Sequence, residues 1–369
     1  MVADPDYSEF FGPIFDSMPL DDANIIAAHR ALVDVRISYG ISVAQYVSRL
    51  GSGDQRFKAT EKRVLGGGGI NFAMVGASLG HHTTFLGLIG TEELALLKSE
   101  LNGRTLPDLD PIFTDPAHNY VREFTDANFV DVVSSSLTDD QISKLNEKFS
   151  KLQMGKKDFL AICSLYLQIV LPNLDISPNL FIDSGYGVER AKDKVFQKIV
   201  DVLKGATKLE RLIVACNESE LVFLTSEFGI HTDDPVADAN ALSKKLSDLS
   251  GKRVELFLHT SRYSTLAEPD TSSLWVAPAA VINPKRRTNA GDTLAGSFIC
   301  ALSSTNDPRS SALFGNLATA YRLSSDELPN RENLLGFRAR LRQRDELNVA
   351  SRVEIVSPSE FRGKLVRAA

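Results

Sequence analysis

Residues 289–293 read Asn-Ala-Gly-Asp-Thr and lead directly into the apolar run 293–302. A run of this length predicts a buried helix. Small residues at the start of a helix leave consecutive backbone N–H groups free, and these groups together with the helix dipole bind anions. Asp292 stands inside the first turn, where its carboxylate reaches a hydroxyl held beside such an anion. The simpler alternative is that Asp292 only caps its own helix, and both interpretations stay open on these residues alone.

A glycine run at 66–69 precedes a second helix, which we predict over 70–80. The run does not fit the GxGxxG dinucleotide fingerprint, because its sixth position is Asn71 and residues 58–63 before it are polar rather than strand-like. The Walker-type motif GxxxxGKS/T does not occur in the sequence. The run therefore predicts a turn whose backbone approaches a ligand closely, with the Asn71 amide near bound hydroxyls. A purely structural turn is the alternative.

The segment 217–220 reads Asn-Glu-Ser-Glu, follows a predicted strand at 211–216 and opens a predicted helix at 219–227. Carboxylates and an amide at the C-terminal end of a strand suit a hydrated Mg²⁺ beside phosphates, since magnesium keeps several waters and takes few protein ligands. Alternatively, Asn217 is an N-cap and Glu220 completes a capping box.

Helices and strands alternate along most of the chain. The predicted elements are strands 24–28, 33–39 and 83–89, a hairpin at 120–133, helix 138–152, strands 159–163 and 180–183, helix 188–203, strand 211–216, helices 219–227 and 235–249, strand 254–259, and helices 293–302, 310–323 and 330–344. This alternation favours an α/β fold with three layers, in which helices cover both faces of a mostly parallel sheet. Strand 33–39 and the hairpin fall outside the pattern and predict a small separate β subdomain.

Composition and charge exclude several classes of protein. Of the 369 residues, 43% are hydrophobic and 24% are charged, which is typical of a globular chain. Lysine and arginine number 41 against 47 acidic residues, a net charge of −6, and the longest basic run is Lys285-Arg286-Arg287. We therefore expect no nucleic-acid partner.

Targeting and cysteine patterns point to an ordinary intracellular protein. Residues 1–20 lack the positive start and apolar run of a signal peptide, and no stretch of 18 apolar residues occurs. We expect no membrane segment and a cytoplasmic location. Cys163, Cys216 and Cys300 lie too far apart in the sequence to suggest a disulfide framework or a zinc site.

Taken in order, these motifs resemble those of the ribokinase-like (PfkB-type) carbohydrate kinase superfamily. Gly66 and Gly67 with Asn71 are similar to its GGxxxN signature, the segment 217–220 to its NxxE metal motif, and the segment 289–292 to its GxGD anion-hole motif. The resemblance spans roughly residues 24–325. It implies a ribokinase-like fold in which a small β lid stands over the sheet.

The resemblance implies in-line transfer of the terminal phosphoryl group of ATP or ADP, with Mg²⁺, to a hydroxyl of a carbohydrate or related small molecule. Asp292 would accept the hydroxyl proton, and N–H groups at the start of its helix would stabilise the transferring group. The residues implied are, for catalysis, Asn289, Ala290, Gly291 and Asp292; for the acceptor, Asp34, Gly66, Gly67 and Asn71; for the nucleotide, Asn217, His259 and Thr260; and for the metal, Glu220.

The resemblance also implies a domain organisation. An N-terminal extension at 1–23 would precede a kinase domain at 24–369, with a lid formed by about 29–50 and 118–135 that excludes water from the reaction. A homodimer through the lid is part of the same expectation.

Three positions depart from the family pattern. Asn289 replaces a glycine of the anion-hole motif, Glu92 stands where aspartate is common, and Ser184 replaces a proline or similar residue. Asparagine tolerates unusual backbone angles better than most residues. These departures bear on substrate class rather than on the presence of the catalytic core.

Alternatives remain open for the nucleotide that donates the phosphoryl group and for the activity of the chain. Segment 217–220, the pair His259-Thr260 and the lid segment 118–124 resemble the ADP-dependent branch of the superfamily, whereas the short chain suits an ATP-dependent member, which we favour. A nucleoside or vitamin kinase of the same fold is a further alternative. From a different class, the rival is a non-catalytic regulator that binds a sugar or nucleotide, although such a binder has no need of Asp292.

Overall fold

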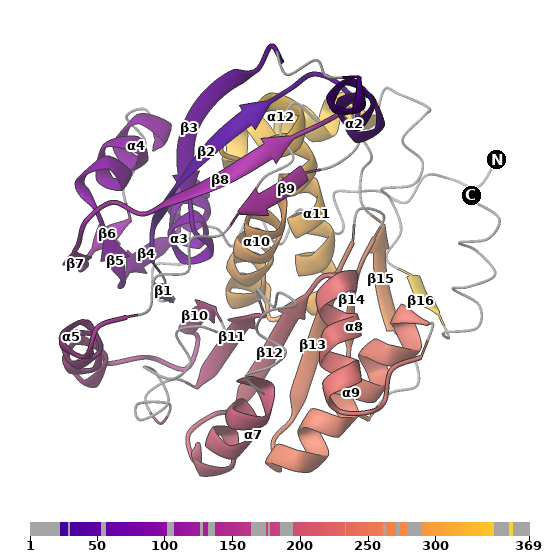
Figure 1. Ribbon diagram of the computed structural model, residues 1–369. Helices are drawn as coiled ribbons and strands as arrows, with labels where there is room; N and C mark the ends of the chain where they lie inside the picture. The colour runs from indigo at the N-terminus through magenta and orange to yellow at the C-terminus, as the bar shows by residue number, and fades with distance from the viewer. Residues whose placement is uncertain are drawn as a thin grey trace.

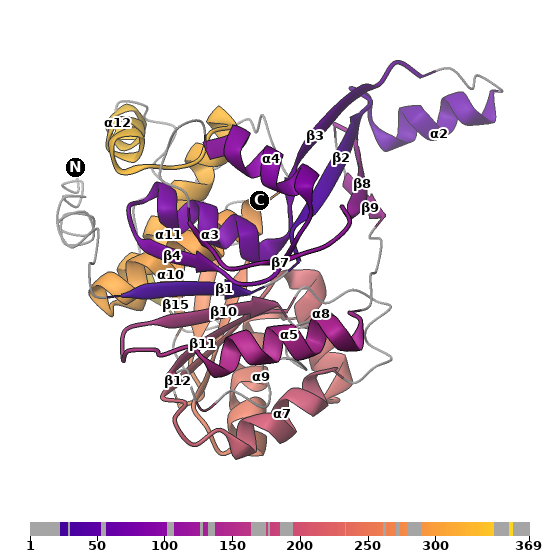
Figure 2. The same cartoon turned by 90° about the vertical axis from the view of Figure 1, so that its left-hand side faces the viewer.

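The computed structural model describes residues 23–28, 30–52, 57–101, 107–125, 128–131, 137–163, 175, 178–184, 195–232, 234–260, 263–270, 274–278, 289–342 and 354–356. A ten-stranded sheet lies at the centre, with helices against both faces (Figures 1 and 2). The predicted three-layer α/β fold is confirmed. The predicted extension 1–23 lies outside the described residues apart from Ala23.

The central sheet is mostly parallel, as the alternation of helices and strands predicts. Its order is β6 (Asp108–Leu109), β4 (His82–Phe85), β1 (Asn24–Ala28), β10 (Phe159–Cys163), β11 (Asn179–Asp183), β12 (Arg211–Cys216), β13 (Val254–His259), β14 (Tyr263–Ala267), β15 (Leu274–Pro278) and β16 (Glu354–Val356). In this spatial order, the strands from β6 through β13 are parallel to one another. The remaining strands, β14, β15 and β16, each pair antiparallel with the strand before them.

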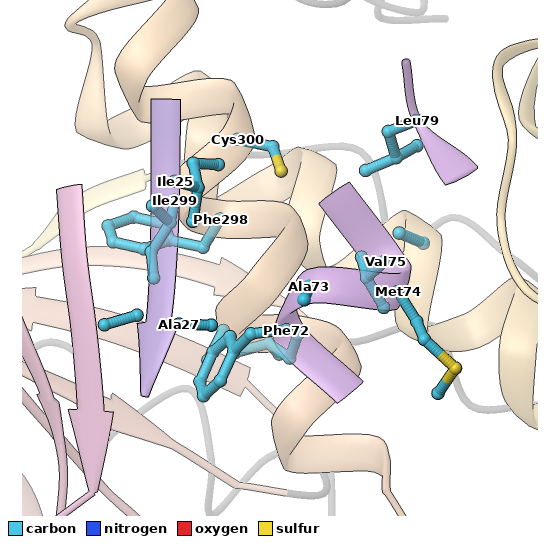
Figure 3. Packing of buried hydrophobic residues seen from close by; sticks show 14 of the residues in the cluster. Ile25, Ala27, Phe72, Ala73, Met74, Val75, Leu79, Phe298, Ile299 and Cys300 are labelled. Carbon is cyan, nitrogen blue, oxygen red and sulfur yellow. The ribbon is translucent and has the colours of Figure 1, made fainter. Parts of the chain in front are cut away.

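The two faces of the sheet bury separate hydrophobic layers because side chains alternate along each strand. Ile25 and Ala27 face one layer, and Ile26 and Ala28 face the other. The first layer contains α3 (Gly68–Ser78), α4 (Thr91–Leu101), α10 (Ala290–Thr305), α11 (Pro308–Ser325) and α12 (Arg331–Arg342). The second contains α5 (Asp139–Ser150), α7 (Val195–Gly205), α8 (Glu218–Glu227) and α9 (Pro235–Ser250). Figure 3 shows residues of α3 and α10 packed together against β1.

A second sheet stands apart from the first and carries the predicted hairpin. Its strand order is β3 (Thr60–Gly66), β2 (Leu32–Ser38), β8 (His118–Glu123) and β9 (Asn128–Asp131), and β8 pairs with β9 antiparallel. We call this sheet, together with helix α2 (Val43–Gly51), the lid. Figure 2 shows α2 at the far end of the lid, away from the central sheet.

The predicted lid at 29–50 and 118–135 omits strand β3, and the description of residues 58–63 as not strand-like is wrong for residues 60–63. The first four residues of β3 are exposed and polar, so they carry no apolar alternation. The glycine run does therefore follow a strand, although Asn71 still breaks the dinucleotide fingerprint. Helix α2 was not predicted, but the capping box of Ser42 and Gln45 marks its start.

Several predicted boundaries need correction. The strand at 83–89 is two short strands, β4 and β5 (Leu88–Ile89), and β5 pairs with β7 (Ile112–Phe113) in a two-stranded sheet. Helix α4 was not predicted. The predicted helix 330–344 is α12, and Leu334 and Phe337 anchor it because they are buried. Residues 188–194 of another predicted helix lie outside the described residues.

Two further expectations from the sequence can be compared with the described residues. Cys216 and Cys300 are buried free thiols. Within the described ranges, no helix combines the length and apolar character needed to cross a bilayer.

Candidate active site

The N-terminus of α10 is built on an unusual backbone conformation. Asn289, the residue before the helix, has φ 61° and ψ 18°, in the left-handed region, and its side chain makes no capping hydrogen bond to the helix. The helix is buried from Thr293 to Ser303, which fixes its direction. The first N–H groups of α10 are thus presented at a rigid helix start, the arrangement that binds anions.

The structure gives a physical reason for asparagine at position 289. Asparagine occupies the left-handed region more readily than other residues with a side chain. Asn289 Nδ2 also donates to the Leu65 carbonyl at 3.1 Å and to Asn71 Oδ1 at 3.3 Å. A glycine would adopt the same backbone but could not make these bonds, so Asn289 ties α10 to β3 and α3.

Asp292 and Asn71 lie in contact although 221 residues separate them. Asn71 Nδ2 donates to Asp292 Oδ2 at 3.2 Å and to the Gly67 carbonyl at 3.0 Å. Gly67 has φ 97°, a conformation that only glycine adopts without strain. The turn at Gly67 therefore sets the position of Asn71, and Asn71 in turn orients the Asp292 carboxylate.

Asp34 enters the same region from the lid. A Cβ atom added to Gly66 would lie 2.4 Å from Asp34 Cγ, so the missing side chain is what lets the Asp34 carboxylate pack against β3. Asn119 Nδ2 donates to Asp34 Oδ1 at 3.2 Å, and both residues are 7% exposed. Residues from three segments predicted separately are therefore brought together around Gly66 and Gly67.

Asp183 at the end of β11 is a site residue that the sequence analysis did not select. A Cβ on Gly68 would lie 3.4 Å from Asp292 Oδ1 and 3.6 Å from Asp183 Oδ2, so both carboxylates face the start of α3. The available signal was an acid directly after a buried strand, at the sheet edge where ligands bind in parallel α/β folds.

Asn217 and Glu220 form a capping box. Glu220 N donates to Asn217 Oδ1 at 2.9 Å, and Asn217 N donates to Glu220 Oε2 at 2.8 Å. Ser184 Oγ donates to the same Glu220 oxygen at 2.8 Å, which links the end of β11 to the first turn of α8. The helix-capping alternative for these two residues is therefore observed, and the position of Ser184 has a structural explanation.

Comparison with solved structures identifies the architecture. Phosphofructokinase-2 from Escherichia coli, in complex with substrates and products, matches with a TM-score of 0.64 and 15% identity over 86% of this chain and 98% of that one. The chain has the ribokinase-like fold. Ribokinase from Thermotoga maritima matches with a TM-score of 0.58 and 16% identity, covering 86% and 99% of the two chains. Adenosine kinase from Anopheles gambiae matches with a TM-score of 0.62 and 12% identity, covering 83% and 98%.

The structural neighbours of this ribokinase-like fold are thus PfkB-family kinases that differ in substrate. They give no particular support to the ADP-dependent branch. No family model and no curated protein sequence matches the chain. At 12–16% identity these likenesses show the fold, while donor, acceptor and catalytic residues stay predictions.

PfkB-family kinases generally use magnesium nucleotides, and the groups of this chain that could fit such a metal are the carboxylates near the strand ends. Asp183 pairs with Ala215 of β12, and Glu220 Oε2 accepts from Asn217 N directly after that strand, so both residues lie near the end of β12. Among the described residues no group of three potential ligands converges on one point. Magnesium takes only one or two protein carboxylates when phosphates supply the rest, so Asp183 and Glu220 fit a hydrated ion held mainly by a nucleotide.

His259 and Thr260, at the end of β13, take different positions. A Cβ on Gly291 would lie 3.3 Å from His259 Cε1, so the imidazole lies against the first turn of α10. Burial lowers the pKa of His259 to about 4, and the ring is neutral near pH 7. The Thr260 hydroxyl donates to the Tyr263 carbonyl at 3.1 Å and accepts from its N–H at 3.0 Å, closing the turn to β14. His259 therefore lies beside the start of α10, whereas the hydrogen bonds of Thr260 are those of a turn.

Glu92 fixes helix α4 to the lid. Its Oε1 pairs with Arg63 of β3 at 2.8 Å and its Oε2 pairs with His118 of β8 at 2.9 Å. The hydrogen bonds from His118 and Arg63 lower the pKa of the Glu92 carboxyl. The longer glutamate side chain at this position thus spans two lid strands.

Proposed function

We propose that this chain is a carbohydrate kinase that transfers the terminal phosphoryl group of a nucleotide to a hydroxyl of a sugar or related small molecule. The observation that carries the proposal is the 3.2 Å contact between Asn71 Nδ2 and Asp292 Oδ2 at the uncapped start of α10. It joins an acid, an amide and an anion-binding helix end in one place. A helix cap alone needs only the acid.

In this mechanism, Asp292 accepts the proton of the acceptor hydroxyl as that hydroxyl attacks the terminal phosphorus. Backbone N–H groups of Ala290, Gly291 and Asp292 donate to the oxygens of the transferring group, where negative charge has to be stabilised. Asp34 and Asn71 bind other hydroxyls of the acceptor and hold it in line with the phosphate. The lid excludes water, which would otherwise compete as acceptor.

A bound Mg²⁺ would neutralise the charge of the nucleotide phosphates. Asp183 and Glu220 would hold it through its water shell, because the capping bonds already use Glu220 Oε2. Asn217 acts in this scheme through Glu220, whose backbone N–H its side chain binds. Nucleotide contacts for His259 and Thr260 stay a prediction.

Glu220→Gln is expected to raise the magnesium concentration needed for half-maximal activity several-fold, because a carboxylate is lost from the water shell of the ion. The amide still accepts the capping hydrogen bonds, so unfolding stability should fall by no more than about 1 kcal/mol. The measurement is a magnesium titration of turnover beside a thermal melt.

The matched control is Glu218→Gln, which removes the same charge from the same helix turn at an exposed side chain. An unchanged magnesium requirement in Glu220→Gln, together with a lower melting temperature, would mean that Glu220 is a helix cap only.

We favour ATP as donor, with ADP as the alternative. The helix end must receive the terminal phosphate in either case, so a site for ADP places the β-phosphate where a site for ATP places the γ-phosphate. The test is phosphorylation of a panel of pentoses, hexoses and nucleosides with ATP alone and with ADP alone, each freed of the other enzymatically and followed by mass spectrometry. Turnover with ADP only would reverse the choice of donor. Binding without turnover would mean that the chain is a regulator.

We further propose that the chain forms a homodimer through the lid. Val47 and Leu50 of α2 are 58% and 46% exposed, and Tyr120 of β8 is 45% exposed. Exposed apolar side chains on the projecting helix α2, with a further one on β8 of the lid, favour an interaction surface. The double variant Val47→Glu/Leu50→Glu is expected to be monomeric by light scattering, whereas Ser48→Glu, on an exposed polar position of α2, keeps the dimer. A wild-type monomer would contradict the proposal.

The cytoplasmic location stays a prediction.

A further inference from the structure

One face of the lid carries a row of polar side chains that begins at Asp34. Side chains at alternate positions of a strand share a face, so Arg36 and Ser38 lie on the same face of β2 as Asp34. The register pairs Asp34 with Asn119 and Ser38 with Glu123 of the neighbouring strand β8, which puts those two residues on this face as well, on either side of the buried Val121 opposite Arg36. Arg36 is about 7 Å along the strand from Asp34, within the length of a small sugar.

The guanidinium of Arg36 is held by Glu123. Arg36 Nε donates to Glu123 Oε1 at 2.8 Å, and Nη2 lies 2.6 Å from the same oxygen. Ser38 Oγ donates to the other oxygen, Glu123 Oε2, at 2.6 Å. The side chains of Arg36 and Glu123 are only 8% and 13% exposed, so the pair is largely removed from water. Breaking such a pair leaves an unpaired buried charge and is strongly unfavourable.

This pair decides what the lid face presents to an acceptor. A phosphate ester is recognised by arginine whose donors are available in a fork. Here Glu123 engages the Nε–Nη2 edge of the fork, and Asp34 adds a second carboxylate to the same face. Lys62, opposite Arg36 on β3, is paired with Asp326 at 2.8 Å. A dianionic phosphate would therefore be repelled by the carboxylates of Asp34 and Glu123, while the charge of the Arg36 guanidinium is already neutralised by Glu123.

We propose that Glu123 is a specificity-determining residue, which holds Arg36 so that this site accepts uncharged polyhydroxyl acceptors and rejects their phosphate esters. The inference rests on the proposed kinase function, since it concerns the acceptor of that reaction. Hydroxyl groups gain from a row of paired acids, amides and hydroxyls, because each can donate to one and accept from another. A phosphate would bind the Nε–Nη2 edge of Arg36 only by displacing Glu123.

The experiment compares wild type with Glu123→Gln and with the double variant Arg36→Gln/Glu123→Gln. The single variant keeps the size of the side chain but leaves Arg36 with its charge uncompensated, and the double variant removes both charges. Inorganic phosphate is the first probe, titrated in a thermal-shift assay against chloride at the same ionic strength. Glu123→Gln is expected to bind phosphate about tenfold more tightly than wild type, and the double variant is expected to lose this gain. Any phosphate that binds at the start of α10 does so in all three proteins, so it does not contribute to the difference between their thermal shifts.

The second measurement is turnover of neutral sugars and nucleosides beside their monophosphates. Wild type is expected to use only the neutral compounds, and Glu123→Gln should raise the ratio of phosphorylated to neutral turnover by about tenfold. Efficient use of a monophosphate by wild type would overturn the inference and leave the kinase function standing. Equal phosphate affinity in the single and double variants would also overturn it. If no protein turns over any acceptor, the kinase function fails and the inference with it. If Glu123→Gln does not fold, the inference is tested by wild type alone: use of neutral acceptors only supports it, and efficient use of a monophosphate overturns it.

Discussion

Asp292→Asn is expected to lower the turnover number about 10²–10⁴-fold, the usual effect of removing a general base, while the chain keeps its fold and still binds nucleotide. Asparagine has nearly the shape of aspartate and can still accept the hydrogen bond that Asn71 donates to Asp292. What it cannot do is take up the proton of the attacking hydroxyl. The backbone N–H groups of α10 are unchanged, so the anion site should survive.

The control for this substitution is Asp307→Asn at the start of α11. Asp307 accepts from the N–H groups of Arg309 and Ser310, which is helix capping by the side chain, and asparagine caps equally well. Asp307→Asn should therefore leave both turnover and melting temperature unchanged. If Asp292→Asn unfolds, or retains full turnover on the identified acceptor, Asp292 has a structural role at the start of α10 and is not the base.

The sequence predicts the central sheet because its strands carry a strong local signal. Short, mostly apolar runs with helices between them occur at 159–163, 211–216 and 254–259. They form β10, β12 and β13 of the parallel part of the sheet, where β12 and β13 are adjacent and β11 lies between β10 and β12. A buried strand in a parallel sheet is apolar on both faces, so it is visible without any knowledge of its partners. The lid strand β3 has the opposite character, because its exposed polar residues carry no such pattern.

The candidate site is only partly readable for a related reason. The short motifs show that Asn71, Asp292 and Asn289 are unusual, but not that the Asn289 side chain binds the Leu65 carbonyl 224 residues away. Leu65 is also held through its N–H, which donates to Glu100 Oε1 at 3.0 Å, and Glu100 Oε2 pairs with Arg322 at 3.0 Å. Contacts at this sequence separation depend on how helices α4, α10 and α11 pack, and residue spacing does not encode that packing.

Gly66→Ala is expected to reduce kcat/KM for the acceptor about 10²-fold, with nucleotide affinity nearly unchanged. The new methyl group would lie 2.4–2.6 Å from three atoms of the Asp34 carboxyl group, so that carboxylate must rotate away. Its hydrogen bond from Asn119 is then lost, and a displacement of about 1 Å in a residue that positions the substrate commonly costs this much. Gly205→Ala is the control, because a Cβ there meets no atom within 4 Å.

The Asp34→Ala background separates this mechanism from a general disturbance of the glycine turn. Removing the Asp34 carboxylate should itself weaken acceptor binding far more than nucleotide binding, because hydroxyls of the substrate lose their buried partner. It also removes the atoms that the methyl group at position 66 would meet. Gly66→Ala should therefore add little further loss in that background, a non-additivity expected only for groups in direct contact. Two results would contradict this mechanism: full additivity of the two substitutions, or an equal loss of nucleotide and acceptor affinity in Gly66→Ala alone. Either result would mean that Gly66 acts through the start of α3 and the turn at Gly67 rather than through Asp34.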